Sequence, residues 1–289
     1  MSWITKWQVF SESLTKVEKI SPSCSVGGMK TRFKLALIFT LLLSLNLSPA
    51  TASISHIHNV EVFGKKILLG THEGLFEHKS ASETKQIGKI DFDLMGLASF
   101  GSKLYASGHP GKVSKALNPL GLITSSDGGM SWQQVSLAGE VDFHLLEVGR
   151  FDIYGVDAGS NQLFYSKDLG KTWKKLGVNS YSDIAILDNK KRDLFAIKQG
   201  SLLLASAGFN KVKKVASKLQ FSSIESLGSK LYASSDKDLY QVSSSGEKIV
   251  KLYSFPSPIL GISASKSQVV IVTAKTLYIS KDGAVSFQS

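Results

Sequence analysis

The chain has 289 residues, of which 43% are hydrophobic, and its 34 lysines and arginines against 23 aspartates and glutamates give a net charge of +11. Most of that charge is lysine, whereas nucleic-acid readers usually rely on arginine forks, so we expect no nucleic-acid partner and only a weak attraction to anionic envelope surfaces. The single cysteine, Cys24, excludes a disulfide framework and a thiolate metal site from the rest of the chain.

The N-terminal region is typical of a secretory signal peptide. Residues 35–47 are uncharged and mostly apolar, three basic residues precede them, and the small residues Ala50 and Ala52 follow. This run is short of the roughly 20 residues that span a bilayer, and the basic–apolar–small order is that of a cleaved signal. We predict a non-native extension at 1–28, a signal peptide at 29–52 cut after Ala52, and a secreted mature protein.

From residue 53 onward the chain repeats short apolar runs separated by glycine, serine, aspartate and asparagine, with no sustained helical periodicity. One run opens each unit: His58–Val62, Met95–Ser99, His144–Val148, Ala185–Asp188, Ser223–Ser226 and Leu260–Ser263. A second follows it: Ile67–Gly70, Leu104–Ser107, Ile153–Val156, Leu194–Ile197, Leu231–Ser234 and Val270–Thr273. A period of about 40 residues is that of a propeller blade. We predict that 53–289 form an all-β, six-bladed β-propeller of four-stranded antiparallel blades, with a truncated outer strand in the last blade.

A specific turn motif recurs within these units. Residues 125–132 and 166–173 share the pattern Ser-x-Asp-x-Gly-x-Ser/Thr-Trp, and 280–287 is a weakened copy. The motif resembles the Asp-box, or BNR, repeat of sialidases, sortilin-type receptors, xyloglucanase-like hydrolases and photosystem assembly factors. The resemblance implies that the aspartate caps turn amides and that the aromatic ring packs under the sheet. The residues that would take these structural roles are Asp127, Trp132, Asp168, Trp173, Asp282 and Phe287.

Three further segments, Thr71–Phe76, Ser107–Gly111 and Asp142–His144, resemble a group of exported bacterial BNR-repeat proteins often labelled glycosyl hydrolase. The resemblance implies hydrolase-like descent, but likeness of fold does not establish chemistry. Sialidases of this fold hold the substrate carboxylate with three arginines. Only Arg150 and Arg192 follow residue 52, both between the first and second strands of a unit, so we expect no sialidase activity.

The candidate site lies in the first half of the repeat array. In a blade whose strands run outward from the axis, the first strand starts and the second strand ends on the same edge. Five histidines fall on that edge of three consecutive blades, and they are the candidate metal ligands: His56, His58, His72, His109 and His144. Three carboxylates join them as candidate catalytic residues: Glu73, Asp93 and Asp142. The sixth histidine, His78, is predicted at the opposite end.

This arrangement leaves several functions open. Imidazoles with a carboxylate suit a divalent transition metal, and in its strongest form the prediction puts His58, His144 and one more histidine on a single ion. A glycoside hydrolase would instead need a carboxylate pair with one raised pKa. A non-catalytic, monomeric propeller would use the pocket for a glycan, a small ligand or a protein loop. The polar groups could also simply bond backbone amides. The long loop after His109 is expected to act as a lid.

Overall fold

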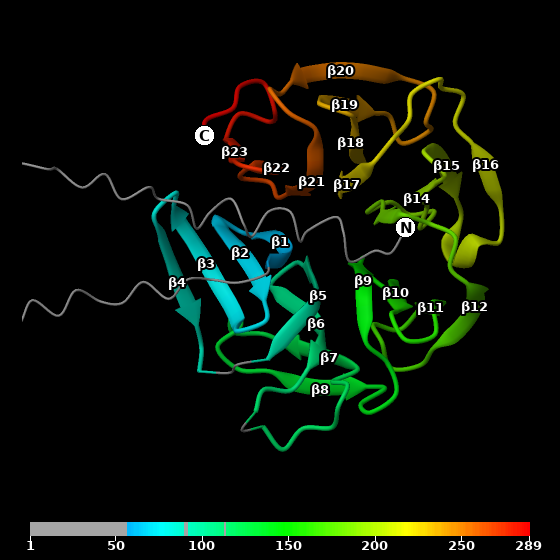
Figure 1. Cartoon of the computed structure of the whole chain (residues 1–289). Coiled ribbons are helices and arrows are strands. Elements are labelled where there is room, and N and C mark those ends of the chain that lie inside the picture. The colour runs from blue at the N-terminus through cyan, green and yellow to red at the C-terminus, as the bar shows by residue number, and fades with distance from the viewer. Residues whose placement is uncertain (1–56, 90–91, 113) are drawn as a thin grey trace, which may run out of the picture.

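The computed structural model describes residues 57–89, 92–112 and 114–289. In this part of the chain, six antiparallel sheets form a ring around a central axis, with the colour running from blue to red around it (Figure 1). The predicted all-β, six-bladed propeller is confirmed. The predicted signal peptide, the extension before it and His56 lie outside the described residues. Within them, helix is limited to one 3-10 turn at Ala207–Phe209, and no helix is long and apolar enough to cross a bilayer.

The strands follow one another from the axis to the rim in each blade. Blade 1 contains β1 (Ile57–Phe63), β2 (Lys66–Thr71), β3 (Gly74–Ser80) and β4 (Glu83–Ile87). Blade 2 contains β5 (Asp93–Phe100), β6 (Lys103–His109), β7 (Leu122–Ser125) and β8 (Gln133–Ser136). Blade 3 contains β9 (Phe143–Val148), β10 (Ile153–Asp157), β11 (Gln162–Ser166) and β12 (Lys174–Val178).

The second half of the ring repeats this order. Blade 4 contains β13 (Asp183–Ile186), β14 (Leu194–Lys198), β15 (Ser201–Ala205) and β16 (Val212–Lys214). Blade 5 contains β17 (Ser223–Leu227), β18 (Lys230–Ser235), β19 (Asp238–Val242) and β20 (Ile249–Ser254). Blade 6 contains β21 (Ile259–Ala264), β22 (Val269–Thr273) and β23 (Leu277–Ser280). An isolated bridge between Ile279 and Gln288 stands where a fourth strand would be.

The hydrophobic core lies between neighbouring blades. The second strand of each blade is covered on both faces, so it reads as a continuous apolar run, and every residue of β22 is buried. The rim strands face solvent, and four of the five residues of β4 are exposed. Val62 of blade 1 packs in one cluster with Val272 of blade 6, so apolar contact closes the ring between its first and last blades.

Polar side chains join consecutive blades at the axis. The innermost strand of each sheet is an edge, and its outward-facing N–H groups need acceptors. Glu147 of blade 3 accepts a hydrogen bond from the Ile186 amide of blade 4 at 3.0 Å. Ser263 of blade 6 accepts one from the Val62 amide of blade 1 at 2.8 Å. Such bonds satisfy the inner edges without a strand shared between blades.

Three hairpins of like geometry connect third strands to the segments outside them. Asp127 Oδ1 accepts hydrogen bonds from the Ser131 amide at 3.0 Å and the Ser125 hydroxyl at 2.8 Å. Asp168 and Asp282 accept the same pair of bonds in their own turns. A hydrogen bond from the Ser131 hydroxyl to Oδ2, together with these two bonds, holds the pKa of Asp127 down to about 2. The aromatic residues that end the hairpins pack onto the core beneath: Trp132, Trp173 and Phe287.

Candidate functional site

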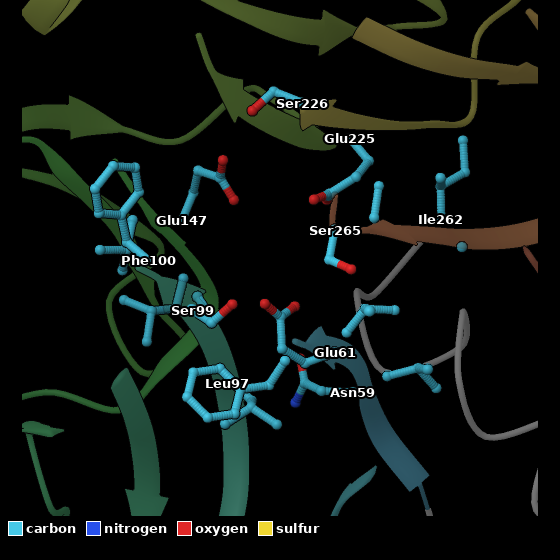
Figure 2. A pocket seen from close by; sticks show the side chains of 18 of the residues that line it. Asn59, Glu61, Leu97, Ser99, Phe100, Glu147, Glu225, Ser226, Ile262 and Ser265 are labelled. Atoms are coloured by element: carbon cyan, nitrogen blue, oxygen red, sulfur yellow. The ribbon is translucent and has the colours of Figure 1, made fainter. Parts of the chain in front are cut away.

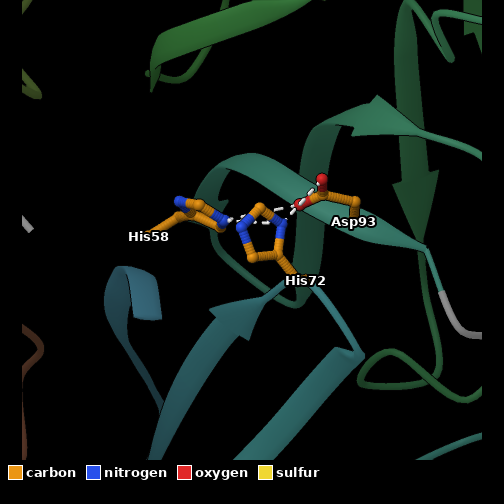
Figure 3. Close-up of side chains that lie close together, drawn as sticks. All are labelled: His58, His72 and Asp93. Atoms are coloured by element: carbon orange, nitrogen blue, oxygen red, sulfur yellow. Dashed lines mark hydrogen bonds and ion pairs between the residues drawn. The ribbon is translucent and has the colours of Figure 1, made fainter. Parts of the chain in front are cut away.

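The first cluster of imidazoles and carboxylate lies between blades 1 and 2. His58 comes from β1, His72 directly follows β2, and Asp93 opens β5. His72 Nδ1 is 2.8 Å from Asp93 Oδ2 and 3.2 Å from His58 Nε2, and His58 Nε2 is 3.4 Å from Asp93 Oδ1. The imidazole rings meet edge to face, with their centroids 4.3 Å apart. Figure 3 shows the three polar ends directed toward one another.

The charge state of Asp93 follows from its neighbours. Burial would raise the pKa of this carboxyl, but hydrogen bonds from His58 and His72, together with their positive charge, bring it below its ordinary value. The carboxylate is therefore ionised at neutral pH, as a metal ligand must be. A lowered pKa also disfavours Asp93 as the general acid of a glycosidase, which needs a raised one.

The second cluster lies between blades 2 and 3. Asp142 Oδ2 is 2.8 Å from His144 Nε2 and 3.2 Å from His109 Nε2. His109 Nδ1 is also 2.7 Å from Asn118 Oδ1, on the long loop of blade 2. His58 and His144 thus pair with different carboxylates, and the strongest form of the metal prediction, with both histidines on one ion, stays a prediction. Each histidine pairs with the carboxylate at its own blade boundary, and the two boundaries are different.

Glu73, His78 and Arg150 are not members of either cluster. Glu73 occupies the turn after β2, where its amide donates to the Thr71 hydroxyl at 3.0 Å. His78 lies near the far end of β3, away from the other histidines, and burial lowers its pKa. Arg150 makes a two-bond pair with Asp188 in the connections after first strands, at the opposite end of the blades from the histidine clusters.

A cavity of about 1010 Å³ runs along the axis between the inner strands. His58, His72 and His144 line it at one end, and Arg150 lies toward the other. Figure 2 shows Glu61, Glu147 and Glu225 projecting into the space from three different inner strands. They come from blades 1, 3 and 5, and Asp183 of blade 4 also lines the cavity.

The three glutamates are hard to ionise. Burial raises the pKa of Glu61 to about 7, although hydrogen bonds from Ser99 and Ser263 oppose the rise. Burial also raises the pKa of Glu147, to about 8. The pKa of Glu225 rises well above its ordinary value through burial and then through repulsion by the other two glutamates. Carboxyl groups with raised pKa values in a cavity are candidates for functional groups.

The sequence pattern does not single out the three glutamates, although a spacing points to two of them. His58 and His144 are each followed three residues later by Glu61 and Glu147. In a regular strand, residues three apart face opposite sides. The pairing register slips at His58 in β1 and at His144 in β9, and such a bulge re-aims the side chains around it. Both members of each pair therefore line the cavity.

No family model matches the sequence, and no curated protein matches it. Similar solved structures share the fold at low identity. They include nidogen, in a complex with laminin, at 10% identity with a TM-score of 0.57, covering 78% of this chain and 92% of that one. The tricorn protease has 15% identity and a TM-score of 0.56, and the match covers 80% of this chain and 25% of the protease chain. The extracellular domain of the putative one component system BT4673 from B. thetaiotaomicron has 13% identity and a TM-score of 0.52, covering 82% and 33%. These likenesses define the chain as a β-propeller.

Proposed function

We propose that this chain is an exported propeller that binds a divalent transition metal through His58, His72 and Asp93, and that the ion holds a ligand at the mouth of the axial cavity. One observation carries the proposal. One ligand atom from each of the three residues lies within 4.8 Å of the other two, although the residues come from two blades. The cluster therefore forms only when neighbouring blades pack together, because no single hairpin contains all three residues.

The donor set and its spacing favour zinc or a neighbouring metal. Two imidazole nitrogens and a carboxylate oxygen suit borderline cations such as zinc, nickel and copper. Ligands at about 2.0–2.1 Å in a tetrahedron lie about 3.3 Å from one another. The two imidazole nitrogens are 3.2 Å apart, and the Asp93 carboxylate lies 2.8 Å from His72 Nδ1 through Oδ2 and 3.4 Å from His58 Nε2 through Oδ1. Three protein ligands leave a fourth position open for water or a bound molecule.

Access to that open position comes from solvent and from the cavity. The exposed fractions of the side chains are 16% for His58, 41% for His72 and 24% for Asp93. The cavity lies at the upper end of the range of small-molecule sites. A glycan or another small ligand is our preferred class. Nidogen, which has a similar fold, was solved with laminin, and this supports a protein loop as the alternative.

Two finer parts of the proposal rest on sequence motifs. The uncharged run at 35–47 and the alanines before residue 53 support export. The three hairpins around Asp127, Asp168 and Asp282 support membership of the Asp-box, or BNR, class. A glycoside hydrolase ranks below a binding protein, because Asp93 has a lowered pKa and Asp142 is paired with two imidazoles.

Calorimetric titration of the purified protein with Zn²⁺ tests the proposal. We expect saturable binding that His72→Ala and Asp93→Asn each weaken by more than about 100-fold, since even partners one step removed from a metal contribute 10–100-fold. His78→Ala is the matched control, because this histidine lies outside the cluster. The affinity of this variant for Zn²⁺ should equal that of wild type. A wild-type protein without saturable binding would contradict the proposal, as would unchanged affinity in both cluster variants.

A further inference from the structure

The connections between first and second strands gather at one end of the ring, opposite the histidine clusters. The two strands are antiparallel, so a first strand that starts at the histidine end turns at the other end. In all six blades, this connection or the residue that opens the next strand is basic. One exposed residue from each blade defines the basic ring: Lys65, Lys103, Arg150, Lys190, Lys230 and Lys266. Lys65, Arg150 and Lys266 line the cavity, so the basic ring surrounds its second mouth.

The lysines of the basic ring are not neutralised within the described part of the chain. Arg150 pairs with Asp188, but no described carboxylate lies within 4.0 Å of the ammonium group of any of the five lysines. The aspartates of the three turn hairpins lie at the same end, nearer the rim, and each is bonded within its own turn. Lysine ammonium groups attract an anionic surface without requiring a fixed geometry. The basic ring is therefore a patch of positive charge around the axis.

Large apolar side chains are exposed in turns at the same end. Phe151 directly follows Arg150 and is 51% exposed. Met130 is 59% exposed and Val285 is 75% exposed, and both lie in the hairpins that follow third strands, in blades 2 and 6. We call these three residues the apolar tips. Basic residues combined with exposed apolar side chains are typical of surfaces that lie in the interface of an anionic bilayer. An acidic polymer would use the lysines and leave the apolar tips in water.

The histidine end is less suited to a negative surface. Carboxylates stand among its lysines, including Glu73, Asp93, Asp142 and Asp157. Like charges would repel an anionic surface there, so the attraction is strongest at the basic ring. The two ends of the propeller thus differ in the sign of the charge that they favour.

We propose that the basic ring and the apolar tips bind the surface of an anionic lipid bilayer. Six turns around one axis suit a flat partner, and the lipid headgroups would cover the second mouth of the cavity. The histidine end then faces away from the bilayer and stays open to solvent. This inference goes beyond the proposed metal site and shares no residue with it.

Cosedimentation with lipid vesicles tests the inference, with EDTA present so that no metal ion bridges protein and lipid. We expect the purified chain to bind vesicles of phosphatidylglycerol and phosphatidylcholine in equal parts. It should bind pure phosphatidylcholine at least about 10-fold more weakly, and added salt should release it. Combining Lys65→Gln, Lys103→Gln and Lys266→Gln should weaken binding by about 100-fold, because each lysine near an anionic surface contributes about 5-fold.

A matched control removes the same charge from the other end. Lys112, Lys237 and Lys275 are exposed and lie in connections after second strands, at the histidine end. Changing these three lysines together to glutamine should cost less than about 3-fold, since they lie farther from the lipid than the reach of screened charges. Circular dichroism checks that both triple variants are folded. Equal losses in the two variants would overturn the inference, because net charge alone would then explain the binding.

Phe151→Ala tests the apolar tips. This variant should weaken vesicle binding by about 5-fold, because about half of the side chain is exposed and available for burial in the interface. No binding of wild type to the phosphatidylglycerol vesicles would overturn the inference. Binding to soluble polyglutamate but to no vesicle would also overturn it, in favour of an acidic protein partner. These outcomes leave the metal site untouched, because its titration contains no lipid.

Discussion

Replacement of Glu147 by glutamine removes one of the three glutamate carboxyl groups that project into the axial cavity, and it keeps an oxygen that can accept a hydrogen bond from the Ile186 amide. Burial raises the pKa of Glu147 from 4.5 to about 8. Between these two pH values the folded protein keeps a proton that the unfolded chain releases, so the free energy of unfolding falls as pH rises. One pKa unit is worth about 1.4 kcal/mol, so the full shift corresponds to about 4–5 kcal/mol. Water in the cavity screens the charge, and we expect about 1–2 kcal/mol.

Urea unfolding at pH 5 and pH 8.5 measures this effect. From pH 5 to pH 8.5, the free energy of unfolding of wild type should fall by about 1–2 kcal/mol more than that of Glu147→Gln. The variant has no titrating proton at this position. At pH 5, where Glu147 is protonated, the two proteins should be nearly equal. The exposed rim residue Glu83, changed to glutamine, is the control and should behave as wild type. The reasoning is refuted if wild type and Glu147→Gln lose the same stability.

Two further substitutions test the packing of the ring and the backbone beneath the site. Trp173→Ala should cost about 3 kcal/mol in chemical unfolding, because the ring packs against Phe143 and its N–H donates to the Ser136 hydroxyl at 2.9 Å; a cost below about 1 kcal/mol would contradict this. Gly108→Ala should destabilise the fold by about 3 kcal/mol or more and reduce metal uptake, since its φ is +145° and a Cβ would lie 1.9 Å from the Asp93 carbonyl oxygen. A Gly64→Ala control, with nothing within 4 Å, should cost about 1 kcal/mol, and equal effects in the two glycine variants would refute the steric argument.

The fold could be predicted from sequence because each blade is a local unit. Its apolar runs and turns lie within about 40 residues, and the repetition itself identifies the architecture. The same pattern predicts which edge of the blades carries the histidines. Strands alternate in direction, so the start of the first strand and the end of the second strand lie at the same edge. Residues 93 and 109 show this well, because they stand at opposite ends of their segment in sequence and pair directly in the sheet.

The division of the site into two clusters could not be predicted in this way. The division depends on which carboxylate each imidazole contacts. The distances between imidazoles and carboxylates on neighbouring blades are set only when the ring closes. His144 meets Asp142 because both belong to blade 3, whereas His58 reaches forward to Asp93 of blade 2. Two of the axial glutamates, Glu61 and Glu147, could not be placed from the sequence for a related reason. A register slip at His58 and at His144 changes which side chains face the axis, and the spacing of each histidine and glutamate does not by itself reveal the slip.

A crystal structure of the protein grown with Zn²⁺, with anomalous scattering recorded at the zinc edge, tests the metal site most directly. The account predicts an anomalous peak about 2.0–2.1 Å from His58 Nε2, His72 Nδ1 and a carboxylate oxygen of Asp93. A fully occupied peak elsewhere with none at this cluster would contradict it, and so would a crystal with no bound zinc in which the three side chains keep their mutual hydrogen bonds.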